Sequence, residues 1–414
     1  MLTATRLALV IVLAAACATP APQPISSTCK LESRTPTNAA HAIDAEDLRA
    51  MALPKAELGT AYASFNFDWQ LAGFESNEER ARDKSGNPDP ERQALERFGR
   101  LVGYQEMYVP PGIGSPVLRI FTLVSLFRDA AGAGGYLTYG STNSTSTFDV
   151  GPLGDQVEGH RAVASPPFLT RVTIRRGQIL AQVGINRSDA TDVSQEAIEL
   201  ARKLDDRVRR SLTGELRGYT GPAATEVGAE RLQPMAIPQS ELGAEYATYV
   251  EELFSSGFQD NREWTETFSV DPQSDLQIFE TCGRVTGFFQ AFIPQNTDGY
   301  VTTGAHLYSQ RGAASSMVAG FVQREHGLAG HPIRGGQVDA VSEVAVSGLG
   351  DQAAAVMYTF GTGLHLVAVL VRHDRLIGET AVTLKEESAA KASALDLARK
   401  LDARIVKVLA GGTP

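Results

Sequence analysis

The chain has 414 residues, of which 43% are hydrophobic and 21% are charged, and its formal net charge is −10 at pH 7. This composition can supply folded cores, so it excludes disorder as the main state, and the length predicts two or three domains. The acidic balance opposes binding to nucleic acid or to an anionic membrane surface through bulk electrostatics. The three cysteines are too few for a disulfide scaffold and do not form the spaced pairs that hold zinc.

The N-terminus has the features of a secretory signal. One basic residue, Arg6, precedes an apolar run of ten residues from Leu7 to Ala16. A membrane-spanning helix needs about twenty apolar residues, so this run is too short to be one. A basic start, a short apolar stretch and small residues at its end predict a signal peptide over residues 1–16.

The residues Ala15-Ala16-Cys17 resemble the end of the lipobox of bacterial lipoproteins, with Ala14 where leucine is usual. The resemblance implies that Cys17 becomes the first mature residue and is acylated on its thiol. Simple cleavage by a general signal peptidase is the alternative. The stretch 17–44 is rich in Pro, Ser and Thr, which predicts a flexible tether. We expect a protein on the extracytoplasmic side of the cell membrane or outer membrane, in contact with it through the N-terminal lipid only.

The rest of the chain repeats itself. The motif Ala-Glu-x-Leu-x-x-Met-Ala-x-Pro begins at Ala45 and recurs at Ala229, an offset of 184 residues. Two further motifs recur at this offset: Gly-Phe-x-x-Asn, which begins at Gly73, and Gly-Arg-x-x-Gly-aromatic, which begins at Gly99. So many matches at one offset, without a gap, indicate a duplication.

Later matches keep their order while the offset grows, as loops of different length would cause. Leu-Gly-Asp-Gln begins at Leu153 and Leu349, and Leu-Ala-Arg-Lys-Leu-Asp begins at Leu200 and Leu397. A stretch rich in Gly, Thr, Ala and Pro separates the two copies and predicts a linker. The expected organisation is one module over 45–212, a linker over 213–228 and a second module over 229–409.

The same strands are predicted in both copies. Residues 117–127 are β-branched and aromatic, and residues 300–308 match them, so each predicts a strand. Residues 171–183 have the pattern of a strand, a turn and a second strand, and residues 365–382 are their counterpart. Strands joined by short turns pair antiparallel, which predicts an antiparallel sheet in each module.

Helices are predicted to follow these strands. Apolar residues at helical spacing predict a helix at the end of each copy, over 197–212 and 394–409. Stretches rich in small residues predict a weaker helix near 129–139 and near 313–324. The expected fold class is therefore α+β: two tandem copies of a two-layer module, each with an antiparallel sheet packed by helices on one face.

Asp155 and its twin Asp351 are the most prominent candidates for chemistry. As free carboxylates they can serve as general acids, metal ligands or binding groups. However, a Gly-Asp pair is also typical of a tight turn that enters a strand, where the carboxylate accepts hydrogen bonds from backbone N–H groups. We favour the turn.

Glu57 with its twin Glu241, and Arg100 with its twin Arg284, are the other candidate binding residues. A carboxylate and a guanidinium that both copies retain are expected to pair within each module, since such ion pairs are strong when well oriented. A role in binding a ligand is the alternative.

No cofactor or metal site is expected. The oxygen-rich loop 83–89 has its glycine in the wrong place for an EF-hand, and Glu325, His326 and His331 lack a third fixed ligand. The stretch 132–135 is rich in glycine but lacks the lysine of a phosphate-binding loop. No catalytic residue is assigned.

Cys282 stands where the first copy has Phe98, which favours a buried apolar position. A disulfide between Cys29 and Cys282 is compatible with an oxidising compartment, and the sequence leaves it open.

Three functions remain, and they belong to different classes. The sequence favours a lipoprotein of the cell envelope that binds a small molecule or a protein, held in a cleft or contact surface between the modules. The alternatives are an envelope hydrolase that uses Asp155, Asp351 or Glu57, and a purely structural surface lipoprotein. No ligand or partner follows from the sequence.

Overall fold

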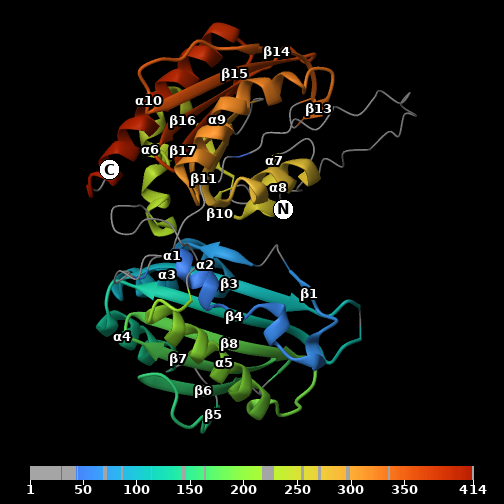
Figure 1. Cartoon of the computed structure of the whole chain (residues 1–414), viewed down its shortest axis with the longest axis vertical. Helices are drawn as coiled ribbons and strands as arrows, with labels where there is room; N and C mark the ends of the chain where they lie inside the picture. The colour runs from blue at the N-terminus through green and yellow to red at the C-terminus, as the bar shows by residue number, and fades with distance from the viewer. Residues whose placement is uncertain are drawn as a thin grey trace, which may run out of the picture.

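The computed structural model describes Cys29, Ile43 and residues 45–68, 72–84, 87–112, 114–141, 146–162, 165–216, 228–252, 256–268, 272–294, 299–333 and 336–412. The predicted signal peptide, Cys17 and most of the tether and linker lie outside these residues. The described chain forms two lobes, one from each copy (Figure 1). None of its described helices is long and apolar enough to cross a membrane.

The first module, which we call module 1, is built on an eight-stranded antiparallel sheet of order β1-β3-β4-β8-β7-β6-β5, with β2 also paired to β3. Its strands are β1 (Asn66–Phe67), β2 (Gly73–Glu75), β3 (Arg100–Val109), β4 (Val117–Phe127), β5 (Ser146–Phe148), β6 (Gln156–Ala162), β7 (Phe168–Arg176) and β8 (Ile179–Arg187). Its helices are α1 (Ala45–Met51), α2 (Asn77–Lys84), α3 (Asp89–Arg97), α4 (Ala130–Ser141) and α5 (Ser194–Leu212), with short 3-10 turns η1 (Lys55–Glu57) and η2 (Thr60–Tyr62).

Module 2 repeats this plan with a nine-stranded antiparallel sheet of order β10-β11-β12-β17-β16-β15-β14-β13, with β9 paired to β11. Its strands are β9 (Tyr249–Glu251), β10 (Gly257–Gln259), β11 (Arg284–Pro294), β12 (Tyr300–Tyr308), β13 (Pro332–Ile333), β14 (Gly336–Glu343), β15 (Gln352–Phe360), β16 (His365–His373) and β17 (Leu376–Leu384). Its helices are α6 (Gln239–Leu242), α7 (Asn261–Phe268), α8 (Pro272–Thr281), α9 (Arg311–His326) and α10 (Glu387–Leu409), with turns η4 (Ala229–Arg231), η5 (Gln233–Met235) and η6 (Ala244–Tyr246).

The predicted strands and helices are confirmed, and β4 and β12 begin and end where the sequence placed them. The α+β class, with antiparallel sheets packed by helices in two similar modules, is also confirmed. The short strands β1 and β2 and the helix pair α2 and α3 were missed, together with β9, β10, α7 and α8 in the second copy. Each sheet is therefore larger than the prediction.

Helices cover both faces of each sheet, which adds a layer to the predicted two. Val172 and Val183 pack in one core with α5, whereas Leu180 packs with α3 and α4 on the opposite face. Because successive residues of a strand point to opposite faces, a strand such as β8 that is apolar at both must be covered twice. In module 2, α10 covers one face and α9 covers the other. We call the sheet faces under α4 and α9 the α4 face and the α9 face.

Candidate functional site

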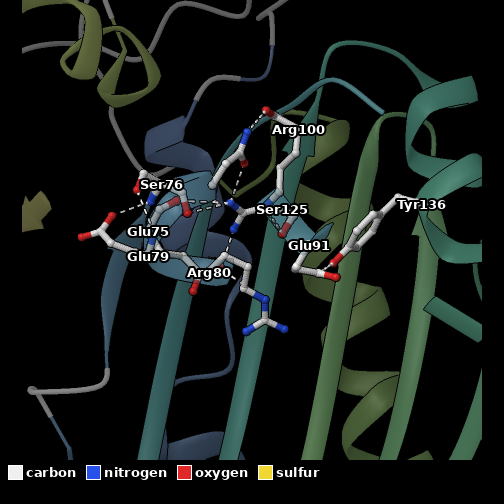
Figure 2. Close-up of polar contacts among 9 residues, drawn as sticks. Glu75, Ser76, Glu79, Arg80, Glu91, Arg100, Ser125 and Tyr136 are labelled. Atoms are coloured by element: carbon white, nitrogen blue, oxygen red, sulfur yellow. Dashed lines mark hydrogen bonds and ion pairs between the residues drawn. The ribbon is translucent and has the colours of Figure 1, made fainter. Parts of the chain in front are cut away.

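The two repeated motifs meet in space at the end of β3. The guanidinium of Arg100, only 4% exposed, donates to Oδ1 of Asn77 at 3.1 Å, to the carbonyl oxygen of Ser76 at 3.2 Å and to Oγ of Ser125 at 3.1 Å. It also donates to the carboxylate of Glu75 at 2.5 Å, and Nδ2 of Asn77 donates to the carbonyl oxygen of Arg100 (Figure 2). Arg100 therefore fastens the β2–α2 corner to the sheet.

The spacing of the Gly-Arg-x-x-Gly motif makes room for this guanidinium. A Cβ atom at Gly103 would lie 2.0 Å from Nη2 of Arg100, and a Cβ atom at Gly287 would lie 2.5 Å from Nη2 of Arg284. Real Cβ atoms do not approach a nitrogen so closely, so only glycine lets the arginine fold back over its own strand.

Module 2 keeps the arginine and changes its partners. Arg284, 3% exposed, still donates to Oδ1 of Asn261 at 2.9 Å and to the carbonyl oxygen of Gln259 at 3.3 Å. Gln259 occupies the position of Glu75, so the carboxylate of module 1 has been lost. Arg284 instead donates from Nε to Nδ1 of His306 at 2.8 Å. Burial lowers the pKa of Arg284 to about 10.

His306 links this arginine to a carboxylate on β17. Its Nε2 lies 2.7 Å from Oε2 of Glu379. Because Nδ1 accepts from Arg284, the proton of the neutral ring is on Nε2 and is donated to Glu379. Burial lowers the pKa of His306, and the charge of Arg284 lowers it further. The ring is therefore neutral, and the carboxylate that balances Arg284 has moved from β2 to β17.

Equivalent residues of the two modules touch at their junction. β2 and β10 lie side by side, and the ring centroids of Phe74 and Phe258, which are related by the 184-residue offset, are 6.1 Å apart. Each ring also packs on an aromatic residue of its own module, Tyr104 at 5.0 Å and Phe288 at 5.1 Å. Contact between identical positions is the signature of an isologous, two-fold-like interface.

A capping box lies on each side of this junction. Ser76 and Glu79 cap α2 reciprocally: the backbone N–H of Glu79 donates to Oγ of Ser76, and that of Ser76 donates to Oε2 of Glu79. Asp260 and Glu263 cap α7 in the same way. Neither box was predicted, although Ser-x-x-Glu and Asp-x-x-Glu at the 184-residue offset are their sequence signal.

The capping glutamates carry pKa values above the usual range for a carboxyl group. Burial raises the pKa of Glu79 to about 7, against the hydrogen bonds from Ser76 and Phe258, and the charge of Glu75 adds to the rise. Burial, followed by the charges of Asp260 and Glu79, raises the pKa of Glu263 well above its usual range. The junction therefore holds acidic groups that titrate closer to neutral pH.

A single apolar core continues from one module into the other. It includes Leu48 and Met51 of α1 and their counterparts Leu232 and Met235 at the start of module 2. In the described residues, the modules thus meet through a packed apolar contact.

Asp155 and Asp351 lie in equivalent turns. Oδ2 of Asp155 accepts from the backbone N–H of Gly177 at 2.7 Å, and Oδ2 of Asp351 accepts from that of Asp374 at 2.8 Å. The glycines before them, Gly154 and Gly350, have φ of +59° and +50°, a region that favours glycine. The carboxylates therefore hold the turn that the Gly-Asp pair predicts.

Glu57 and Glu241 form equivalent ion pairs with the last helix of their modules. Glu57 accepts from Nη1 of Arg207 at 2.6 Å, and Glu241 accepts from Nη1 of Arg404 at 2.7 Å. The pairing is thus not between Glu57 and Arg100, whose carboxylate partner is Glu75. The sequence could not choose among the arginines because the partners are 150 residues apart.

The α4 face of module 1 carries a cluster of polar side chains, of which three are buried and one, Arg171, is half-buried. Val172 and Ile174 point into the core with α5, so Arg171, the residue before Val172 on β7, points to the opposite, α4 face. His160 lies directly opposite Arg171 in the β6–β7 pair, and therefore on the same face. Arg80 of α2 and Tyr136 of α4 are buried in the helical layer that covers this face. We call the four residues Arg80, Tyr136, His160 and Arg171 the polar cluster.

Module 2 fills the same positions with apolar side chains. The pair opposite each other in β15 and β16, Val356 and Ala368, replaces His160 and Arg171. Trp264 replaces Arg80, and Met317 replaces Tyr136. All four replacements belong to the apolar core of the α9 face.

Comparison with known proteins gives a weak structural likeness. No protein-family model and no curated protein matches the chain. Among solved structures, it is similar to the extracellular domain of PknH from Mycobacterium tuberculosis, at 12% sequence identity and a TM-score of 0.32, over 44% of this chain and 100% of that one.

Two further residues considered in the sequence, Glu325 and Cys282, form contacts within the fold. Glu325 is buried and bonds to the hydroxyl of Tyr358 at 2.7 Å and to Arg324. Among the residues that the structure describes, no group of three His, Cys, Asp or Glu side chains is placed to hold a metal ion. Cys282 is fully buried and forms a disulfide with Cys29, with Cα atoms 5.2 Å apart and a sequence separation of 253.

Proposed function

We propose that this chain is an extracytoplasmic protein, lipid-anchored through Cys17, that binds a ligand through module 1. The lipobox-like end of the signal sequence and the Pro-, Ser- and Thr-rich tether support the anchor. The two modules act as one body, since their cores are continuous across the junction.

The disulfide between Cys29 and Cys282 supports the location. Disulfides form and persist in oxidising compartments outside the cytoplasm, whereas thiols stay reduced inside it. The bond also ties the tether to module 2, so that only the stretch from Cys17 to Cys29 separates the lipid from the folded body. Twelve residues of sequence at about 3.5 Å each span at most about 40 Å, which keeps module 2 near the membrane.

The carboxylates considered for hydrolysis are already hydrogen-bonded within the fold, which favours a binding function over hydrolysis. Asp155 and Asp351 accept backbone N–H bonds in equivalent turns, and Glu57 is paired with Arg207. A general acid or base must reach a substrate proton, and these groups already serve the fold in both modules.

The observation that carries the binding role is the contrast between the α4 face and the α9 face. The same backbone packs an apolar core in module 2, so the fold does not require the polar cluster of module 1. Buried polar groups that the fold does not need are typical of binding sites.

Acyl labelling of the full-length chain in a bacterial host tests the anchor. The labelled protein should appear in the membrane fraction and be digested by protease added outside the cytoplasm. Cys17→Ser should abolish the label, with Cys29→Ser as the matched control that keeps it. A label that survives Cys17→Ser, or a chain protected from external protease, would contradict the proposal.

A further inference from the structure

We infer that module 1 binds a small oxyanion, such as a phosphate group, between the α4 face and helices α2 to α4, with Arg80 and Arg171 as its main ligands. The inference rests on the proposed binding function and adds the chemical class of the ligand. His160 and Tyr136 border the same space.

The two arginines have unused donors. Among the described residues, the side chain of Arg171 forms no hydrogen bond or ion pair, and its Nε is buried without a partner. Arg80 is 9% exposed, and its one ion pair there places Nε 3.8 Å from Oε1 of Glu75, beyond hydrogen-bond distance. Its terminal nitrogens point away from Glu75 (Figure 2). Planar guanidinium groups with free N–H donors match the oxygens of phosphate or carboxylate.

The nearby carboxylates are already bonded to other groups. Glu75 accepts from Arg100, Glu91 accepts from the hydroxyl of Tyr136, and Glu158 lies 2.9 Å from Nε2 of His160. Burial lowers the pKa of Arg171, and the positive charge of Arg80 lowers it further, while Tyr136, Glu158 and Glu91 act in the opposite direction with smaller effects. The two cations therefore repel each other. An anion between them would relieve that repulsion and fill their donors.

His160 provides a further unfilled position. It is 6% exposed, and its Nδ1 is buried with no hydrogen-bond partner in the described residues. The polar cluster reaches solvent on the β6 side, because the side chain of Glu158 is 28% exposed and Arg171 is half-buried. A small ligand can therefore reach the polar cluster without separating the sheet from α4.

The cost of these groups to the fold also points to a ligand. Replacing buried charges by well-packed apolar residues is often neutral or stabilising, and module 2 shows that Val356 and Ala368 fit the equivalent positions. A cation that is partly removed from water without a hydrogen-bonded protein partner is costly unless something else compensates it.

Calorimetric titration with inorganic phosphate tests the inference directly. The protein is the mature chain carrying Cys17→Ser, purified without its lipid. We expect one site per chain, and Arg80→Gln or Arg171→Gln should weaken phosphate binding by about tenfold or more, as expected for the loss of a charged hydrogen bond. The matched control is Arg202→Gln, which removes one exposed positive charge on α5 and should leave the affinity unchanged.

Acetate, sulfate and an uncharged sugar serve as comparison ligands. Phosphate binding that survives Arg171→Gln, or that Arg202→Gln weakens equally, would overturn the oxyanion site. Binding of the sugar alone, lost in Arg171→Gln, would overturn the ligand class and leave the proposed binding function intact. Because Arg171→Gln can disturb packing, the double variant His160→Val/Arg171→Ala, which copies module 2, provides a second test: it should remain folded and fail to bind phosphate.

Discussion

The carboxylate of Glu79 in module 1 accepts a hydrogen bond from the backbone N–H of Phe258 in module 2, at 2.9 Å. The same carboxylate closes the capping box of α2 through Ser76. One side chain thus caps the N-terminus of a helix in its own module and accepts a backbone hydrogen bond from an edge strand of the other module. This arrangement makes the junction sensitive to the charge of Glu79.

Stability should fall as pH rises toward neutrality. Burial raises the pKa of Glu79 from 4.5 to about 7, so the folded chain holds this proton more tightly than the unfolded chain does. The contribution to stability is therefore complete below the unfolded pKa and is lost as pH rises through the folded pKa. Thermal unfolding between about pH 5 and about pH 8 should show a falling midpoint.

Glu79→Gln should flatten that pH profile, because glutamine does not titrate. The pKa of Glu263 is raised in the same direction, so adding Glu263→Gln should reduce the slope further. Glu215→Gln, which removes an exposed carboxylate after α5, is the control and should leave the slope unchanged. An unchanged slope in the double variant would rule out the junction as its source.

Removing the aromatic contact at the junction should destabilise the whole chain. Phe258→Ala deletes a buried ring that packs on Phe74 and Phe288, and such deletions cost about 3–5 kcal/mol. Denaturant unfolding should show this loss, whereas Phe67→Ala, at a ring that is 41% exposed, should cost much less. Equal losses for the two variants would contradict a packed junction.

Gly103→Ala should be destabilising although alanine is the smallest change available. The new Cβ would lie 2.0 Å from Nη2 of Arg100, so the buried guanidinium must move and lose bonds. We expect a loss of about 1–3 kcal/mol in urea unfolding, the usual range for overpacking. Gly112→Ala, where nothing lies within 4 Å, is the control and should cost little.

Asp155→Ala should lower stability and leave binding intact. The substitution removes the acceptor for the N–H of Gly177 and the partner of Arg175, which are worth about 1–2 kcal/mol in a partly exposed turn. Asp351→Ala should have the same effect in module 2. A ligand affinity that falls with either substitution would return these carboxylates to the list of binding residues.

The sequence could predict the duplication and the long strands because both depend on local pattern. Apolar periodicity placed β4 and α5, and the Gly-Asp pair predicted the turn at Asp155. The pairing of Glu57 with Arg207, and of Cys29 with Cys282, depends on tertiary contacts 150 and 253 residues apart, which no local pattern encodes.

The polar cluster could not be predicted from the sequence either, for a different reason. Its residues come from α2, α4, β6 and β7, and in sequence each is one polar residue among many. Aligning the two copies does show that Ala368 is the equivalent of Arg171. Only the structure shows that each of these residues faces a layer of helices in its own module. Because a second layer of helices, which was not predicted, covers these positions, the exchange of polar for apolar residues between the modules marks a candidate site.

Thermal unfolding of the ligand-free His160→Val/Arg171→Ala variant tests the central claim most directly. If the polar cluster serves a ligand and not the fold, exchanging it for the residues of module 2 should leave the unfolding midpoint unchanged or raise it. A clear fall in the midpoint, by several degrees relative to the parent chain, would show that His160 and Arg171 stabilise module 1 themselves and would contradict the account.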